Sequence, residues 1–122
     1  MELNEYQNKA MSTCMDSCDN YSYMMLNLVG EVGELASKVA KKIRKKEACI
    51  EHKELVFVNV DKNENFDKEL MLEAGDIAWQ LAGLCKVMGW TLEEVCQANL
   101  DKLQARKQAG TIDGNGDGIY NR

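Results

Sequence analysis

The sequence predicts an all-α protein, organised as one domain that folds as a four-helix bundle. Three observations support this prediction. The chain of 122 residues contains no proline, and Leu, Ala, Lys, Glu and Met dominate its composition, which favours helices over a turn-rich β fold. Apolar residues recur at helical spacing in successive segments. A capping signal and a glycine separate the last two segments. The length suits one modest core, so residues 1–122 are expected to form a single domain.

The first two predicted helices cover the first third of the chain. One runs from Leu3 to about Cys18 and ends at the break Asp19-Asn20. The other runs from about Tyr21 to Lys46, because it carries an apolar stripe that falls within about 100° of arc. Basic residues in its last turns suit the helix dipole, either as a solvated helix end or as phosphate contacts. Its apolar stripe is Met24, Leu28, Val32, Leu35, Val39 and Ile43.

Residues 47–65 are predicted to be a variable, irregular or extended connection. The β-branched run Leu55–Val60 has the composition of a short strand, but no partner strand is obvious elsewhere in the sequence. The polar residues 61–65 are typical of a loop that leads into the next helix. That third helix is expected from about Phe66 to Met88, with Gly89 as the residue that ends it.

The fourth predicted helix begins at a capping box. Thr91 can cap the third amide of the helix, while Glu94 can accept from the N-cap amide. The helix is expected to extend to about Gln108. Residues 110–122 contain four glycines and are predicted to be a loop.

Charge and cysteine content exclude several classes of protein. The formal net charge is −5 without a dominant basic patch, which argues against a nucleic-acid partner. The N-terminus lacks the pattern of a secretory signal, and no run approaches the ~18 apolar residues of a membrane helix. The five cysteines leave one unpaired in any disulfide scheme, so a reduced, cytoplasmic protein is expected.

The third predicted helix carries an unusual acidic pair. Residues 70–85 are apolar around most of the helix circumference, which is typical of a buried helix. Glu73, Asp76 and Gln80 fall within roughly 60° of arc on one face. Two carboxylates on a buried helix are costly unless a cation or a hydrogen-bonding partner compensates them.

A second acidic pair lies on the second predicted helix. Glu31 and Glu34 lie three positions apart in the sequence, on one flank of the apolar stripe. An antiparallel hairpin of the two helices would bring the two pairs level. Four converging carboxylates cannot all stay ionised without a counter-charge. Oxygen ligands suit Mg²⁺, with Mn²⁺ as a substitute, and leave coordination positions for water and phosphate.

Simpler interpretations of these residues stay open at this point. Glu31 and Glu34 could form an exposed flank, with Lys38 as an ion-pair partner for Glu34. Three glycines beside the acids fit either close backbone approach at a site or close packing between helices. Those glycines are Gly30, Gly33 and Gly75.

The two acidic pairs resemble a known signature. Glu31-x-x-Glu34 followed by Glu73-x-x-Asp76 is similar to the ExxE…ExxD motif of the MazG-like, all-α nucleoside triphosphate pyrophosphohydrolases. The segments LNEYQNKAM, LVGEVGEL, EAGDIAWQLAGL and the block from Gly89 to Asp117 also resemble this family. The resemblance covers nearly the whole chain except residues 47–65. It implies the all-α NTP pyrophosphatase type of bundle, assembled as a homodimer or a dimer of dimers.

The resemblance also implies an activity. NTP or dNTP and water would give a monophosphate and pyrophosphate, with Mg²⁺ as cofactor, in a role such as nucleotide-pool housecleaning. The implied catalytic and metal residues are Glu31, Glu34, Glu73 and Asp76, with either Glu34 or Glu31 as the base. The implied substrate-binding residues are Lys38, Gln80, Asn99, Lys102 and Arg106.

Some roles are open within this interpretation. Lys38 could pair with Glu34 or contact phosphate, and Gln80 could contact the sugar or base. Trp79 lies more than about 100° from Glu73 around the helix, so packing or a subunit interface suits it better than base stacking.

Three alternative functions remain at this stage: a dUTPase-like activity, a phosphoribosyl-ATP pyrophosphohydrolase-like activity, or a non-catalytic helical interaction module. Two further motifs are weak. Residues 113–118 copy the start of an EF-hand calcium loop but lack its final glutamate. The set Cys14, Cys18, Cys49 and His52 has poor spacing for zinc.

Overall fold

The computed structural model describes residues 1–58 and 65–110, and in these the chain is mainly helical. Four α-helices are present, as the sequence predicts: α1 (Leu3–Met11), α2 (Tyr21–Arg44), α3 (Phe66–Val87) and α4 (Leu92–Gln108). A short 3₁₀ helix, η1 (Asp16–Cys18), precedes α2, and two strands, β1 (Ala48–Glu51) and β2 (Glu54–Phe57), follow it. None of the described helices is long and apolar enough to cross a membrane.

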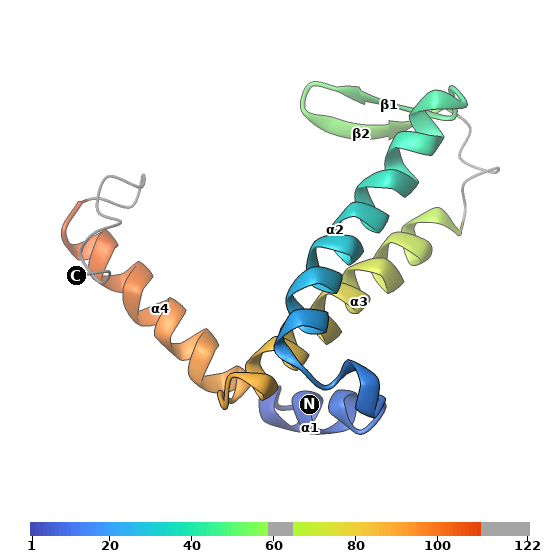
Figure 1. The fold of residues 1–122 in the computed structure, drawn as a ribbon. Helices are drawn as coiled ribbons and strands as arrows, with labels where there is room; N and C mark the ends of the chain where they lie inside the picture. Colours follow the sequence, from blue (N-terminus) through green and yellow to red (C-terminus); the bar gives the residue numbers. More distant parts are fainter. Residues whose placement is uncertain (59–64, 111–122) are drawn as a thin grey trace.

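The two longest helices form the centre of the molecule. α2 and α3 run antiparallel and pack along most of their length (Figure 1). Asn20 caps α2 by accepting a hydrogen bond from the Tyr23 amide at 2.8 Å. Gly83 lies on α3 directly against the fully buried Met24 of α2, where no side chain would fit without displacing Met24. This contact fixes how closely the two helices approach.

The first helix lies across the lower ends of α2 and α3 and closes a small core (Figure 1). Met11 of α1 packs there with Met24 and Ala82. The indole nitrogen of Trp79 donates to the Ala10 carbonyl at 3.0 Å and to the Thr13 hydroxyl at 2.9 Å. Trp79 therefore attaches α1 to α3, which confirms its predicted packing role.

The first helix is shorter than predicted. It ends at Met11 rather than near Cys18, and η1 occupies the end of the predicted span. The hydroxyls of Ser12 and Thr13 donate to the carbonyls of Lys9 and Ala10, at 2.5 and 2.6 Å. Side chains that bind backbone carbonyls in this way compete with helical hydrogen bonding, so the chain turns at this point.

The connection after α2, predicted to be irregular or extended, is extended in the part that the structure describes, and its strands are paired, which the sequence did not predict. β1 and β2 form an antiparallel hairpin in which Glu51 pairs with Glu54. The two turn residues, His52 and Lys53, have positive φ angles of 51° and 70°, as a type I′ turn requires. Phe57 then packs edge-on against Phe66, with ring centroids 5.5 Å apart. The hairpin is thus fixed onto the start of α3. Residues 59–64 lie outside the described part.

The fourth helix begins where it was predicted to begin. Gly89 ends the preceding turn with a φ of 77°, and both hydrogen bonds of the Thr91–Glu94 capping box are formed. The buried side chain of Gln7 joins α1 to this corner: its amide donates to the Trp90 carbonyl and its oxygen accepts from the Leu92 amide.

Beyond this corner the fold differs from the predicted bundle. α4 contacts α1 and the end of α3, then extends away from the α2–α3 pair (Figure 1). Large apolar side chains consequently stay exposed on the long helices. Leu26 and Val29 of α2 are 73% and 69% exposed, and Met71 and Leu72 of α3 are 66% and 62% exposed. One chain alone does not cover its apolar helical surface.

Candidate metal centre

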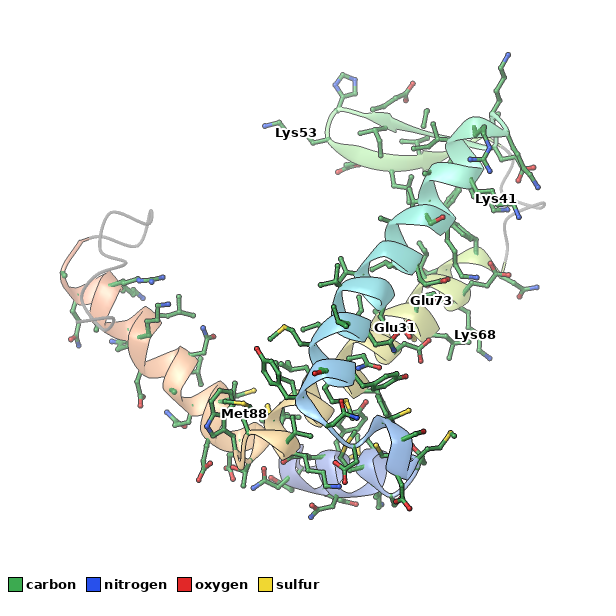
Figure 2. All side chains as sticks on the ribbon, viewed as in Figure 1. Glu31, Lys41, Lys53, Lys68, Glu73 and Met88 are labelled. Carbon is green, nitrogen blue, oxygen red and sulfur yellow. The ribbon has the colours of Figure 1, made fainter. Side chains whose placement is uncertain are left out.

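Three carboxylates meet between α2 and α3. One oxygen from each of Glu31, Glu73 and Asp76 lies within 4.8 Å of the others. Glu31 comes from α2 and the other two from α3, and Figure 2 shows Glu31 and Glu73 on the facing sides of the two helices. The pairing of helices that the sequence predicted thus brings acidic residues 42 positions apart into one group.

The group is supported by a row of amide side chains. Asn27 lies one turn before Glu31 on α2 and donates to it at 3.3 Å. The same amide donates to the buried Gln80 of α3 at 2.6 Å, and Gln80 in turn donates to the Met24 carbonyl at 3.4 Å. Because both amides are committed to these partners, they fix where Glu31 lies relative to α3.

The electrostatics of the group are those of a site that attracts a cation. Burial raises the pKa of Glu31 above its ordinary value of 4.5, and the nearby charges of Asp76, Glu73 and Glu34 raise it further. The hydrogen bond from Asn27 acts in the opposite direction. Only Lys38 offers a positive charge to the cluster among the ion pairs of the described residues, at 3.6 Å from Glu73. The three carboxylates of the group therefore face one positive side chain, that of Lys38.

The donor set fits a hard divalent cation. Three carboxylate oxygens within this separation can approach a common ion, and oxygen ligands are those that Mg²⁺ and Mn²⁺ prefer. Asp76 is exposed, whereas Glu31 and Glu73 are partly buried. One side of the group is therefore open to water and to a ligand that brings further oxygens.

One member of the predicted quartet does not join the group. Glu34 is exposed, and it is absent from the set of carboxylates within 4.8 Å of one another. It still acts on Glu31 through its charge. The predicted alternative, an ion pair between Glu34 and Lys38, is not formed, because Lys38 turns towards Glu73.

A hollow of about 270 Å³ adjoins the carboxylates. It is lined by Tyr23, Asn27, Glu31, Asp76, Trp79 and Gln80. Gln80, a predicted substrate contact, belongs to this lining but is only 2% exposed and holds Asn27 and Met24. These hydrogen bonds connect it to Asn27 and the α2 backbone beside the acidic group. Lys38, another predicted substrate contact, lies at the opposite end of the acidic group.

The remaining predicted substrate contacts lie apart from the acids. Asn99, Lys102 and Arg106 are all on α4, the helix that extends away from the α2–α3 pair (Figure 1). The structure of one chain therefore does not bring them to the carboxylates.

The weaker motifs do not form sites among the described residues. Cys14 and Cys18 precede α2, whereas Cys49 and His52 belong to the hairpin after it, so the zinc set is divided between the two ends of α2. The partial calcium loop at 113–118 lies outside the described residues. Among the described residues outside their own helix backbone, no atom lies within 4 Å of a Cβ added at Gly33 or Gly75, so neither glycine is required for packing in this part of the chain.

Asn27 and Tyr23 were missed by sequence reasoning. With Glu31 they form a row at four-residue spacing along α2, and Asn27 also donates to the Tyr23 hydroxyl at 3.3 Å. Residues four apart share a helix face. The polar residues at this spacing before Glu31 could therefore have identified Tyr23 and Asn27 as neighbours of the acidic motif.

The protein is therefore a mainly helical protein with a candidate metal centre. The carboxylates of this centre come from both helices of the antiparallel α2–α3 pair. Comparison with known proteins identifies the family. Residues 19–111 match the MazG nucleotide pyrophosphohydrolase domain, and the chain belongs to this family. This confirms the resemblance of the acidic motifs and assigns the chain to the nucleotide pyrophosphohydrolases.

One similar protein is known from a bacteriophage. The chain is 38% identical over 124 residues to the Gene 37 protein of Mycobacterium phage L5, an alignment that covers 96% of this chain and 98% of that protein. The name of this relative states no activity. No solved structure matches the chain.

Proposed function

We propose that this protein hydrolyses a nucleoside or deoxynucleoside triphosphate to the monophosphate and pyrophosphate, with Mg²⁺ as its cofactor. The observation that carries the proposal is the convergence of Glu31, Glu73 and Asp76 within 4.8 Å on two packed helices. Family membership supports the reaction class. The carboxylate donors support the choice of a hard divalent cation.

In this proposal Glu31, Glu73 and Asp76 hold the metal. When bound, Mg²⁺ would neutralise triphosphate oxygens and make the α-phosphorus more electrophilic. Asn27 keeps Glu31 in position, and Lys38 limits the repulsion at Glu73. Glu34, one turn beyond Glu31 and exposed to solvent, is assigned to accept the proton of the attacking water.

The proposal includes self-association as a homodimer or a dimer of dimers. Two observations support it: exposed apolar side chains on both long helices, and the extension of α4 away from them. Contiguous exposed apolar surface is typical of protein interfaces. In such an assembly Asn99, Lys102 and Arg106 would reach the carboxylates of another subunit rather than those of their own.

The decisive experiment is a panel of NTPs and dNTPs assayed with Mg²⁺, scoring pyrophosphate and orthophosphate separately. We expect pyrophosphate and the monophosphate in equal amounts, no turnover in EDTA, and partial or full recovery with Mn²⁺. Orthophosphate as the sole product would refute the assignment. Activity that persists in EDTA would refute the metal requirement while leaving the reaction class.

A further inference from the structure

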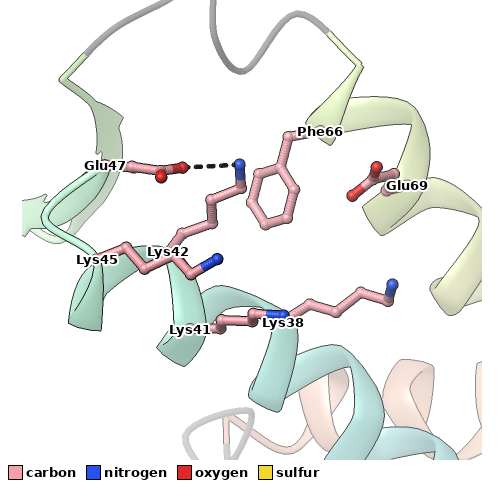
Figure 3. Close-up of a pocket in the computed structure, with 7 residues that line it drawn as sticks. All are labelled: Lys38, Lys41, Lys42, Lys45, Glu47, Phe66 and Glu69. Carbon is pink, nitrogen blue, oxygen red and sulfur yellow. Dashed lines mark hydrogen bonds and ion pairs between the residues drawn. The ribbon is translucent and has the colours of Figure 1, made fainter.

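A second, cationic pocket lies at the hairpin end of α2. It has a volume of about 250 Å³, and we call it the lysine pocket. Figure 3 shows it between the last turns of α2, the start of the hairpin and the first turns of α3. Its lining is Lys38, Lys41, Lys42, Lys45, Glu47, Phe66 and Glu69.

The four lysines share one face of α2 at spacings of three, four and seven residues. Like charges at this spacing destabilise a helix, so their concentration on one face needs compensation. The helix dipole stabilises positive charge only in the last turn of a helix. Because α2 ends at Arg44, Lys38 lies outside that turn.

Only part of this charge is compensated within the chain. Lys42 pairs with Glu47 at 3.0 Å and lies 5.0 Å from the centre of the Phe66 ring (Figure 3). Lys38 pairs with Glu73. Among the described residues Lys41 and Lys45 form no ion pair, and both are exposed. With four lysines and two glutamates, the lining carries two net positive charges.

The lysine pocket adjoins the candidate metal centre through one of its lysines. Lys38 belongs to the pocket lining and also forms the ion pair with Glu73 of the acidic group. On α3, Glu69 of the pocket lies one helical turn before Glu73, which is about 6 Å at 1.5 Å per residue. A chain of phosphates bound at the metal centre by one end would therefore extend into the lysines at its other end.

The size of the pocket limits what it can hold. Its volume of about 250 Å³ is below the range of about 300–1,000 Å³ that encloses drug-sized ligands. A complete nucleotide would not be enclosed, whereas a compact polyanion would be. The single apolar side chain in the lining, Phe66, is covered by Lys42 rather than open for base stacking.

We propose that the lysine pocket binds the β- and γ-phosphates of the substrate and then the pyrophosphate formed from them. The inference rests on the proposed function. Water adds to the α-phosphorus, the bond from that phosphorus to the bridging oxygen breaks, and pyrophosphate leaves with the electron pair. Glu34 accepts one proton of the water and releases it to solvent. Lys41 and Lys45, which lack partners among the described residues, stabilise the charge that develops on the leaving group.

The test is calorimetric titration of the full chain with pyrophosphate, orthophosphate and a nucleoside monophosphate, each in Mg²⁺. Wild-type protein should bind pyrophosphate at least about tenfold more tightly than orthophosphate. The double variant Lys41→Gln/Lys45→Gln should lose about tenfold or more in pyrophosphate affinity. It should raise KM for the triphosphate and leave monophosphate affinity unchanged.

The matched control is Lys53→Gln/Lys68→Gln, which removes the same charge from two lysines that do not line the pocket and that Figure 2 labels on the hairpin and on α3. It should bind pyrophosphate as the wild type does. An unchanged pyrophosphate affinity and KM in Lys41→Gln/Lys45→Gln would overturn the inference alone. Equal losses in both double variants would also overturn it, since net charge would then explain the effect. Failure of the proposed function is detected separately, as the absence of pyrophosphate release from any triphosphate.

Discussion

In the candidate metal centre, the surroundings of Glu31 disfavour the ionised form of its carboxyl group. Glu31 is partly buried beside two other carboxylates, and burial and those charges raise its pKa. Its position is enforced by Asn27, which is itself bound to the buried Gln80. Sites that concentrate like charges in this way are typical of functional rather than stabilising residues.

Glu73→Gln and Asp76→Asn should each reduce turnover by about 100-fold or more, because each removes a charged metal ligand. Their far-UV circular dichroism should match the wild type, since both amides fit the space of the carboxylates. The control is Glu51→Gln in the hairpin, an exposed glutamate remote from the group, which should retain full turnover. Normal activity in either α3 variant would show that the metal centre is misassigned.

The second residue-scale prediction concerns pH and stability. The raised pKa of Glu31 means that the folded state prefers the protonated carboxyl. Its contribution to stability is therefore complete below the ordinary pKa of 4.5 and is lost as pH rises through the higher folded value. In EDTA, Glu31→Gln should melt above the wild type at pH 7.5, with a smaller difference at pH 5.

Mg²⁺ provides the control for this prediction. It should raise the melting temperature of the wild type, because a ligand that binds only the folded state stabilises it, and it should have a weaker effect on Glu31→Gln. A Glu31→Gln variant that melts below the wild type at pH 7.5 in EDTA would contradict the assigned repulsion.

The spacing of apolar residues predicted the helices correctly where that spacing continues along the whole helix. α2, α3 and α4 begin and end within about two residues of the predicted positions, which is the usual uncertainty at helix ends. The hairpin was missed because its turn is His52-Lys53. These residues adopt positive φ without the Asn-Gly or Asp-Gly signal that identifies a type I′ turn. The early end of α1 depends on hydroxyl-to-carbonyl bonds that a periodic pattern does not record.

Alanine substitutions at two glycines of α2 and α3 should have different effects on the stability of the protein. Gly83→Ala should destabilise the protein by about 1–3 kcal/mol, because the added methyl group overlaps the Met24 side chain, which is fully buried. In Gly33→Ala the added methyl group meets no atom within 4 Å among the described residues, apart from the backbone of its own helix and its two chain neighbours. This substitution should be neutral or stabilise by up to about 1 kcal/mol through helix propensity.

Urea denaturation at equilibrium measures both changes. We expect the free energy of unfolding to fall in Gly83→Ala and to stay unchanged or rise in Gly33→Ala. A Gly83→Ala variant as stable as the wild type would show that the α2–α3 contact is looser than the structure indicates. A large loss in Gly33→Ala would point to a packed neighbour from another subunit at that position.

At the scale of the whole molecule, the sequence identified the acidic motifs but not how the four helices combine. Apolar residues on more than one face of α2 and α3 leave the rotation of each helix undetermined, so the sequence did not distinguish Glu31 from Glu34 as the member that meets α3. Nor did it show that α4 extends away from the pair, since a capping box fixes where a helix starts but not its direction. The position of α4 separates Asn99, Lys102 and Arg106 from the carboxylates of the same chain.

Subunit complementation tests whether α4 completes the site of another subunit. Asp76→Asn and Lys102→Ala should each be nearly inactive alone. Refolded together in equal amounts, they should form hybrid dimers with one intact site, and recover about a quarter of wild-type specific activity if pairing is random. Mixing Glu73→Gln with Asp76→Asn is the control: both changes affect α3, so no hybrid site is intact. The two variants carry different affinity tags, so that hybrids can be purified by both. Purified hybrids that remain inactive would show that α4 of one subunit does not serve the acids of its neighbour.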